Sequence, residues 1–387
     1  MIHQGEIVRV PIRAFADPRT GREVRQVSPD GCANATNYFY MSCFTPDDAF
    51  LLYNSSASGT NQVHAVHLET GETRRLTSVT GGLGPHSWNL HPAGRELFFV
   101  TERCARAMDL ETGELRTVFD PAQHPWMKSS AVTPPLRFSG DARFICFQFT
   151  HDPHECVAPN MWSHHGLVRH ARSGVVRVAC DGSAPRRVYL HNEDMQHVMF
   201  CPADPDLITF GVWPDYQNHA PLPDNHRARA WLVDVKADFA RPWLIMPKGH
   251  RATHEYWSPT GDRIFYHKRR VDDIWSPPRW TPCWISHMDR ATGKQTDFFM
   301  SETQHLNHSI CTPDGARVVT DNDDFRNPNE LILVDVKTGK SETLWWRNMA
   351  CRARGTQDGG PVMSAQGRLV AATSDSSGEQ QVYLTAL

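Results

Sequence analysis

The sequence predicts an all-β protein, a seven-bladed β-propeller formed as a single domain by residues 1–387. Three observations support this prediction. Seven short apolar runs each end in a tight polar turn, at intervals of 46 to 63 residues. A second hairpin pattern follows most of these turns, and in three of the runs a histidine stands at the same distance before the turn. Repeats of roughly 40–50 residues that contain only short strands and turns are typical of propellers, with one repeat per blade.

The polar turns mark the inner hairpin of each predicted blade. They are TPDD at Pro46, HPAG at Pro92, FSGD at Ser139, CPADPD at Pro202, SPTGD at Pro259, TPDG at Pro313 and SAQG at Ala365. An open sandwich or barrel is the alternative, and the even spacing over the whole chain argues against it.

Six outer hairpins accompany the inner ones. They are VHAVHLETGETRRLTS, ARAMDLETGELRTVF, VVRVACDGSAPRRVYL, AWLVDVKADFARPWLI, CWISHMDRATGKQTDFF and LILVDVKTGKSETLW. Their alternating apolar and polar residues are the pattern of half-buried strands, and glycine in the turn allows a positive φ.

The seventh blade lacks an outermost strand, because the chain stops at VYLTAL. The segment GREVRQVSPDG, residues 21–31, resembles the outer strands RRLTS and RTVFD. We therefore expect an N-terminal strand to complete the last blade and close the ring, which removes free sheet edges.

Composition narrows the classes of function. The net charge is −3, so nothing favours nucleic acid or an anionic membrane as a partner. The N-terminus has no signal-peptide pattern, and no run of about 18 apolar residues exists. Ten scattered cysteines fit free thiols in a reducing compartment, so we expect a cytoplasmic protein of unknown oligomeric state.

Three histidines occupy equivalent places in their repeats. His197, His254 and His308 each lie five residues before the proline of their turn. Equivalent positions point the same way, so we expect the imidazoles to meet at one mouth of the central channel. His86 is one residue out of register, and Tyr38 and Tyr40 occupy a neighbouring blade, where we expect them to bind substrate. A single histidine would be a core residue, but three in register indicate a site. General-base catalysis and metal ligation both remain open.

Two arginines precede an apolar strand in the segment RARAW. Arg227 and Arg229 are suited to bind a carboxylate; the alternative is that they are solvated side chains on the surface. The nearby His197 and His254 favour a role for Arg229 in the site. The long segments between Ser139 and Pro313 are rich in His, Arg, Asp and Trp, so we expect them to wall a pocket. No GxSxG elbow, P-loop or GxGxxG is present.

Several segments resemble the oligogalacturonate lyase family, whose members are seven-bladed propellers that degrade short pectin fragments. NYFYMSCFTPDD (residues 37–48) resembles the family's NYFY-x-x-CFT motif, THEYWSPTG (253–261) its THEFW-x-PDG motif, and ARAW (228–231) its ARMW motif. The similarity extends in register over most of the chain, and the THE[FY]W match is the most specific.

The resemblance implies roles for individual residues. His254 corresponds to the catalytic base, Arg229 to the arginine that binds the substrate carboxylate, and His197 to the histidine of a GHP segment. His308 corresponds to a ligand of a divalent ion, thought to be manganese, with His305 as a near neighbour. We expect His254 and Arg229 at the channel mouth rather than in the blade cores.

One segment departs from the family. A Gln-x-x-His-x-His segment supplies the other metal ligands, but this chain reads GTQDGGPVMS there, with Gly355, Asp358 and Gly360 at the matching places. Only Asp358 or Gln357 has a side chain that can ligate. Either His305 and Asp358 rebuild a site for manganese or another divalent cation, or the ion is absent.

These implications predict a carbon–oxygen lyase that cleaves a uronate-containing oligosaccharide by β-elimination to a 4,5-unsaturated uronate. Two alternatives remain. One is a lyase for another uronate linkage, such as glucuronate–rhamnose. The other is a non-catalytic sugar- or protein-binding propeller of the TolB-like type, which shares the PDG turns.

Overall fold

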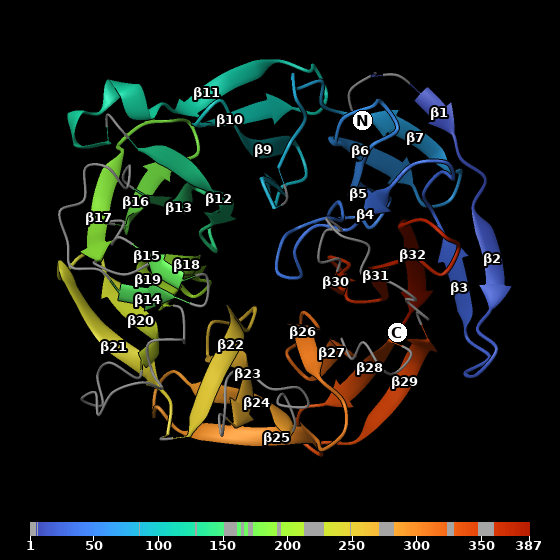
Figure 1. The fold of residues 1–387 in the computed structure, drawn as a ribbon. Helices are drawn as coiled ribbons and strands as arrows, with labels where there is room; N and C mark the ends of the chain where they lie inside the picture. Colours follow the sequence, from blue (N-terminus) through green and yellow to red (C-terminus); the bar gives the residue numbers. More distant parts are fainter. Residues whose placement is uncertain are drawn as a thin grey trace. The chain divides into compact units, whose positions relative to one another are not determined.

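A computed structural model describes most of the chain (Figure 1). The described residues are 5, 7–84, 86–127, 130–150, 161–163, 166–168, 173–191, 195–212, 228–247, 249–270, 282–322, 329–346 and 360–387. They belong to two compact units. Unit 1 comprises Met1–Phe98, Met108–Leu115 and Thr303–Leu387, and unit 2 comprises Phe99–Ala107 and Arg116–Glu302. Each unit is described by itself.

Within the described residues, the strands form seven sheets of four or five strands and one two-stranded pair. Most strands of each large sheet lie close together in the chain, and neighbouring strands pair antiparallel, as in the third to seventh sheets. These sheets are the seven predicted blades, so the prediction of an all-β, seven-bladed propeller is confirmed. No helix in the described part of the chain is long and apolar enough to cross a membrane.

Unit 1 contains three of the sheets. The first has the order β1-β7-β6-β5-β4 and consists of β1 (Ile7–Arg9), β4 (Asn34–Ala35), β5 (Phe50–Ser55), β6 (Gln62–His67) and β7 (Glu72–Arg75). The sixth consists of β26 (Leu306–Cys311), β27 (Arg317–Asn322), β28 (Glu330–Asp335) and β29 (Ser341–Trp346). The seventh has the order β2-β3-β32-β31-β30 and consists of β2 (Arg13–Ala16), β3 (Glu23–Gln26), β30 (Val362–Met363), β31 (Leu369–Ser374) and β32 (Gln381–Ala386).

Unit 2 contains three further sheets. The third consists of β12 (Ala131–Phe138), β13 (Phe144–Thr150), β16 (Ser173–Ala179) and β17 (Arg186–His191). The fourth consists of β18 (Met195–Cys201), β19 (Asp204–Val212), β20 (Ala228–Asp234) and β21 (Phe239–Ile245). The fifth consists of β22 (His250–Trp257), β23 (Arg263–Arg270), β24 (Cys283–Asp289) and β25 (Gln295–Ser301).

The remaining elements complete the list. The second sheet has residues in both units and consists of β8 (Trp88–Leu90), β9 (Glu96–Thr101), β10 (Cys104–Asp109) and β11 (Leu115–Phe119). The two-stranded pair is β14 (Met161–Ser163) with β15 (Gly166–Val168), and the 3₁₀ turns are η1 (Pro121–Gln123) and η2 (Pro125–Met127).

The inner turns share one set of hydrogen bonds. In the turn at Pro313, the Thr312 hydroxyl donates to the Asp314 carboxylate at 2.5 Å and accepts from the Arg317 backbone N–H at 3.1 Å. Ser139 with Asp141, and Thr45 with Asp47, repeat the first bond at 2.6 Å. In these three turns a short hydroxyl side chain followed by an aspartate satisfies the backbone locally and so encodes the turn.

The N-terminal strand completes the seventh sheet, as the sequence predicts. β3 pairs antiparallel with β32, with Val24 opposite Thr385, and the Thr385 hydroxyl donates to the Glu23 carbonyl at 2.9 Å. The sequence does not predict β1, which adds a fifth strand to the first sheet by pairing with β7.

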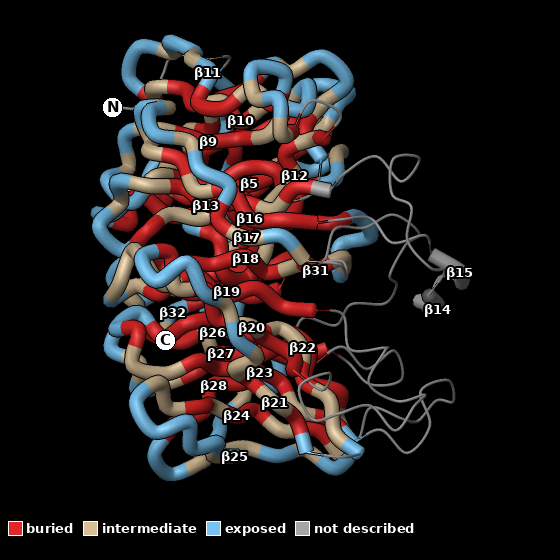
Figure 2. The backbone as a smooth tube through the Cα atoms, turned by 90° about the vertical axis from the view of Figure 1, so that its left-hand side faces the viewer, coloured by how far each residue is buried: buried red, intermediate tan, exposed pale blue. Residues whose placement is uncertain are grey.

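Apolar side chains pack the sheets together within each unit. In unit 1, Val319, Leu331 and Trp345 of the sixth sheet contact Val370 and Tyr383 of the seventh. In Figure 2 the buried positions follow the strands and the exposed positions gather at the turns. Each fully buried side chain of this size contributes roughly 1.5–3 kcal/mol, so the rigid sheets are a firm support for residues at the strand ends.

Candidate active site

Bulges interrupt the first strand of several sheets at the predicted histidines. The pairing of β22 with β23 shifts register between Thr253 and Tyr256, and that of β18 with β19 shifts between Gln196 and Met199. His254 and His197 lie inside these shifts with φ of 54° and 52°. Such values are costly for residues other than glycine, and they concentrate at functional sites. A bulge redirects a side chain out of the regular ladder, and here the side chains are imidazoles.

A buried ionic cluster in unit 2 joins three residues from three strands. The Glu255 carboxylate lies 2.6 Å from Nε of Arg229 and 3.2 Å from Nδ1 of His197. Arg229 also donates through Nη1 to the Val212 carbonyl at 2.7 Å, and its Nη2 lies 3.4 Å from Nδ1 of His197. Burial raises the pKa of the Glu255 carboxyl, but the charges of Arg229 and His197 outweigh it and lower that pKa below its usual value. Glu255 is therefore ionised, and the cluster is a paired buried charge.

A glycine makes room for this cluster. A Cβ on Gly211 of β19 would lie 2.1 Å from Oε1 of Glu255 and 3.2 Å from Cζ of Arg229. The first separation is shorter than any real Cβ contact and the second is tight, so a side chain at this position would displace the Glu255 carboxylate. Sequence reasoning missed Gly211 and Glu255. Glu255 lies inside the THEYW motif, which was the only signal available for it.

His254 is the more accessible imidazole of this group. Its ring centroid lies 6.0 Å from that of His197 and 6.1 Å from that of His267. His254 is partly exposed, whereas His267 is fully buried and Glu255 has no exposed surface. The structure thus brings His254, His197 and Arg229 together, with His254 placed to meet a ligand.

The expected position of Arg229 needs a correction. The sequence predicts this arginine at the channel mouth, but its side chain is 1% exposed and belongs to the interior of unit 2. The physical reason is Glu255, whose buried carboxylate requires a neighbouring cation. The structure therefore gives Arg229 a structural partner that the sequence did not reveal. Arg227 lies outside the described residues.

A second group of predicted residues meets in unit 1. The ring of Tyr38 lies 4.5 Å from that of His86, 4.8 Å from that of Tyr40 and 5.5 Å from that of His308, between centroids. His86 has a φ of 57°, like the two bulge histidines of unit 2. Tyr38 and His86 are partly exposed, while Tyr40, His305 and His308 are buried.

The described residues do not fit a divalent metal site at His308. Its Nδ1 lies 3.1 Å from the Asn307 amide and 3.5 Å from the Asp321 carboxylate. Gly360 has no side chain to offer, and a Cβ there would lie 2.8 Å from Cβ of His308. No three His, Cys, Asp or Glu side chains in the described ranges are placed to hold one ion. Asp358 and Gln357 lie outside the described residues, as does Gly355.

Comparisons with known proteins show the family and the fold of the chain. The family model described as oligogalacturonate lyase matches residues 2–386. The chain is 21% identical to an oligogalacturonide lyase of Pectobacterium atrosepticum and 20% identical to an oligogalacturonate lyase of Dickeya dadantii, over 98% of this chain and 97% of each relative. A solved oligogalacturonate lyase in complex with manganese superposes with a TM-score of 0.83, at 21% identity, over 100% of this chain and 98% of that one. A second solved oligogalacturonate lyase, from Vibrio parahaemolyticus, gives 0.82 at 20% identity, over 99% and 98%.

Proposed function

The chain belongs to the oligogalacturonate lyase family, and from this premise we propose that it cleaves uronate-containing oligosaccharides, of the oligogalacturonate type, by β-elimination. The family implies a lyase that acts on pectin fragments. The observation that supports the proposal most strongly is the cluster of unit 2, where a partly exposed histidine on a bulge adjoins a buried Glu–Arg–His cluster.

His254 is the proposed base. Elimination transfers the C5 proton of the uronate to the imidazole, and the C5–H electron pair forms the C4=C5 double bond. The C4–O4 bond breaks, and the leaving oxygen takes the Nε2 proton of His197 in its imidazolium form. A neutral imidazole at His254 suits the proton abstraction because its ordinary pKa lies near neutrality. The positive φ of His254 supports the assignment, because strained backbone conformations cluster at functional sites.

His197 is the proposed partner of the leaving oxygen. We assign the proton on its Nδ1 to the contact with Glu255, because the carboxylate at 3.2 Å is nearer than the Arg229 Nη2 at 3.4 Å. This leaves Nε2 of His197 for the sugar. Glu255 thus acts as a positioning residue, which holds one ring orientation in the way that carboxylates orient catalytic histidines in general.

Arg229 supplies positive charge close to the reaction. Removing the C5 proton builds negative charge on the uronate carboxylate, and a fixed cation lowers that barrier. Because the guanidinium is buried and bonded to Glu255 and Val212, we propose that it acts mainly through its field and through His197. Bidentate binding of the substrate carboxylate would require the Arg229 guanidinium to leave Glu255 and the Val212 carbonyl.

The test is a direct assay of elimination. Oligogalacturonate is mixed with the protein, and ultraviolet absorbance reports the conjugated double bond that only elimination creates. We expect turnover by the wild type and by His250→Ala, a control at the first residue of the same strand, and its loss in His254→Ala. Turnover only with glucuronate–rhamnose oligomers would transfer the proposal to that linkage. No turnover with any uronate oligomer would leave a binding propeller and overturn the proposal.

A further inference from the structure

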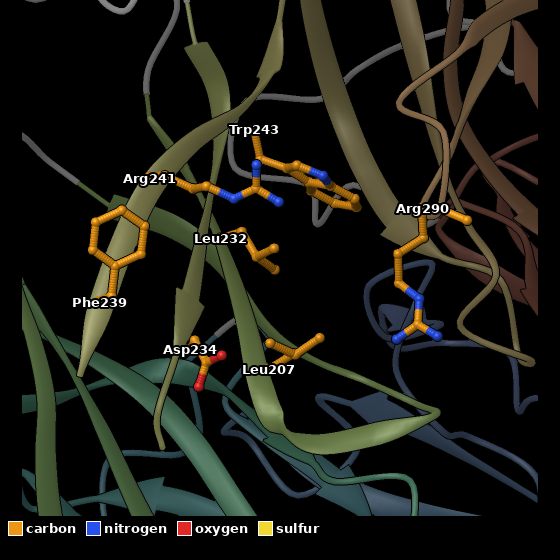
Figure 3. A pocket seen from close by; sticks show the side chains of 8 residues that line it. Leu207, Leu232, Asp234, Phe239, Arg241, Trp243 and Arg290 are labelled. Carbon is orange, nitrogen blue, oxygen red and sulfur yellow. The ribbon is translucent and has the colours of Figure 1, made fainter. Parts of the chain in front are cut away.

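A pocket of about 390 Å³ lies on unit 2, well away from the buried cluster (Figure 3). It is lined by the ends of β19, β20 and β21 and by the turn after β24; the residues are Leu207, Leu232, Asp234, Phe239, Arg241, Trp243, Arg290 and Ala291. Asp234 ends β20, whereas Arg229 stands next to its start, so the two places are roughly 17 Å apart along the strand. The volume falls within the range of small-molecule sites, roughly 300–1,000 Å³.

Two arginines bring positive charge to the pocket. Neither Arg241 nor Arg290 forms an ion pair with any residue that the structure describes; the Arg290 guanidinium donates a hydrogen bond to the Cys201 sulfur, at 3.7 Å. Other arginines of unit 2 do have partners, as in the pair of Arg263 with Asp262 at 2.8 Å. A guanidinium group without an ion-pair partner beside a hollow favours a bound anion, and a carboxylate matches the geometry of a single guanidinium.

The floor and rim of the pocket are apolar. Leu207 and Leu232 form the floor, and Figure 3 shows the Trp243 ring beside the Arg241 guanidinium. Trp243 stacks on Trp257 with ring centroids 5.0 Å apart and an angle of 24° between planes, which fixes its orientation. Phe239 is 58% exposed at the rim. A ligand with an apolar face is therefore expected, since exposed aromatic groups around a hollow mark binding surfaces.

The carboxylate of Asp234 in the pocket disfavours the binding of a simple inorganic anion. The Asp234 carboxylate accepts the backbone N–H groups of Lys236 and Ala237 through Oδ1, at 3.0 and 2.9 Å. Among the described residues no hydrogen bond is made to its Oδ2, so this oxygen is an acceptor for a hydroxyl group. An anion without donors, such as sulfate, would be repelled by it, whereas a hydroxylated carboxylate would be held by both charges.

We propose that this pocket is a second binding site, separate from the active site, for a uronic acid residue. An arginine binds the carboxylate, Trp243 and the leucines contact the C–H face of the sugar ring, and Asp234 accepts a hydrogen bond from a hydroxyl group. The choice of a uronate among hydroxylated ring carboxylates rests on the proposed function. Such a site would hold one end or branch of a saccharide while another part is cleaved.

Tryptophan indole NMR tests the proposal. The full-length protein is labelled with ¹⁵N-tryptophan, Trp243→Phe assigns the Trp243 signal, and galacturonate, galactose and sulfate are titrated. We expect saturable movement of the Trp243 signal with galacturonate and none with galactose or sulfate. In the double variant Arg241→Gln/Arg290→Gln, binding weakens by about tenfold or more, because the charge-assisted pair with the carboxylate is lost and is worth about one such factor. The control Lys337→Gln/Lys340→Gln removes the same charge from an exposed turn and leaves binding unchanged.

Elimination activity is measured on the same proteins, so that the two proposals fail separately. We expect the arginine variant to keep wild-type turnover of a short oligomer. A Trp243 signal that stays still, or that moves equally with sulfate, overturns the second site. A Trp243 signal that moves only with galacturonate, in a protein without elimination activity, keeps the site and overturns the proposed function.

Discussion

Replacing Gly211 by alanine tests the buried cluster with a single methyl group. The backbone of Gly211 does not have a positive φ, so alanine is conformationally allowed and the effect is purely steric. Its Cβ would lie 2.1 Å from Oε1 of Glu255 and 3.2 Å from Cζ of Arg229, so the carboxylate has to move. Overpacking a tight interior costs about 1–3 kcal/mol, and breaking a buried ion pair about 3–5 kcal/mol. Since the pair at 2.6 Å is displaced rather than removed, we expect a loss in the upper part of the overpacking range, about 2–3 kcal/mol.

Urea unfolding followed by tryptophan fluorescence measures this loss. The control is Gly84→Ala, because a Cβ at Gly84 meets nothing within 4 Å and its φ is not positive; we expect a change of at most about 0.5 kcal/mol there. If the free energy of unfolding of Gly211→Ala lies within about 1 kcal/mol of the wild-type value, a change typical of ordinary point mutants, the close contact between Gly211 and Glu255 is refuted. Such a value would mean that Glu255 has room which the structure does not show.

Four further predictions concern the site and the sheet edges. His254→Ala should lower turnover by about 10²–10⁴-fold, the usual contribution of a general base, and calorimetry should show an unchanged melting temperature; a fall in melting temperature with full activity would contradict the role as base. Arg229→Lys keeps the charge but loses the bonds from Nε and Nη1, so we expect reduced turnover together with a lower melting temperature, and a melting temperature equal to that of the wild type would show that the ion pair is unimportant. The pKa of Glu255 is lower in the folded protein than its ordinary 4.5, so the stabilising contribution of its carboxylate is present above pH 4.5 and is lost as the pH falls through the folded value. The difference in free energy of unfolding between wild type and Glu255→Gln should therefore shrink on acidification below pH 4.5. A difference that stays constant would argue against an ionised carboxylate. Deleting residues 1–26 removes β2 and β3 and exposes the edge of β32, so light scattering should detect aggregation; a monomer that melts like the full chain would disprove the closure.

The regular part of the fold was predictable because several sequence repeats use the same hydrogen bonds to form their inner turn. Thr312 and Asp314, or Ser139 and Asp141, satisfy their own turn, so the signal is local and can be read in a few residues. The bulge histidines were found by their equal distance from those turns. The contacts of Gly211 with Glu255 were not predictable, because they join residues from different sheets and no local pattern specifies them.

The burial of Arg229 shows the same limit. An arginine before an apolar strand reads as a surface residue or a ligand-binding one, and only its partner decides between them. That partner, Glu255, is 26 residues further along the chain and on another strand. β1 was also missed, since a three-residue strand of mixed character carries almost no pattern.

The seventh sheet has a consequence for the time course of synthesis. The hydrogen bond from Thr385 to Glu23 joins residues that are 362 positions apart, so β3 is synthesised long before its partner β32. At about 5–20 residues per second the strand waits roughly 20–70 s for its partner. Joining such distant segments costs about 5 kcal/mol of chain entropy, so earlier folding that brings β3 and β32 closer together lowers the cost of this pairing. Until β32 is made, β2 and β3 have no partner strand, and a chaperone that shields them would matter most during that interval.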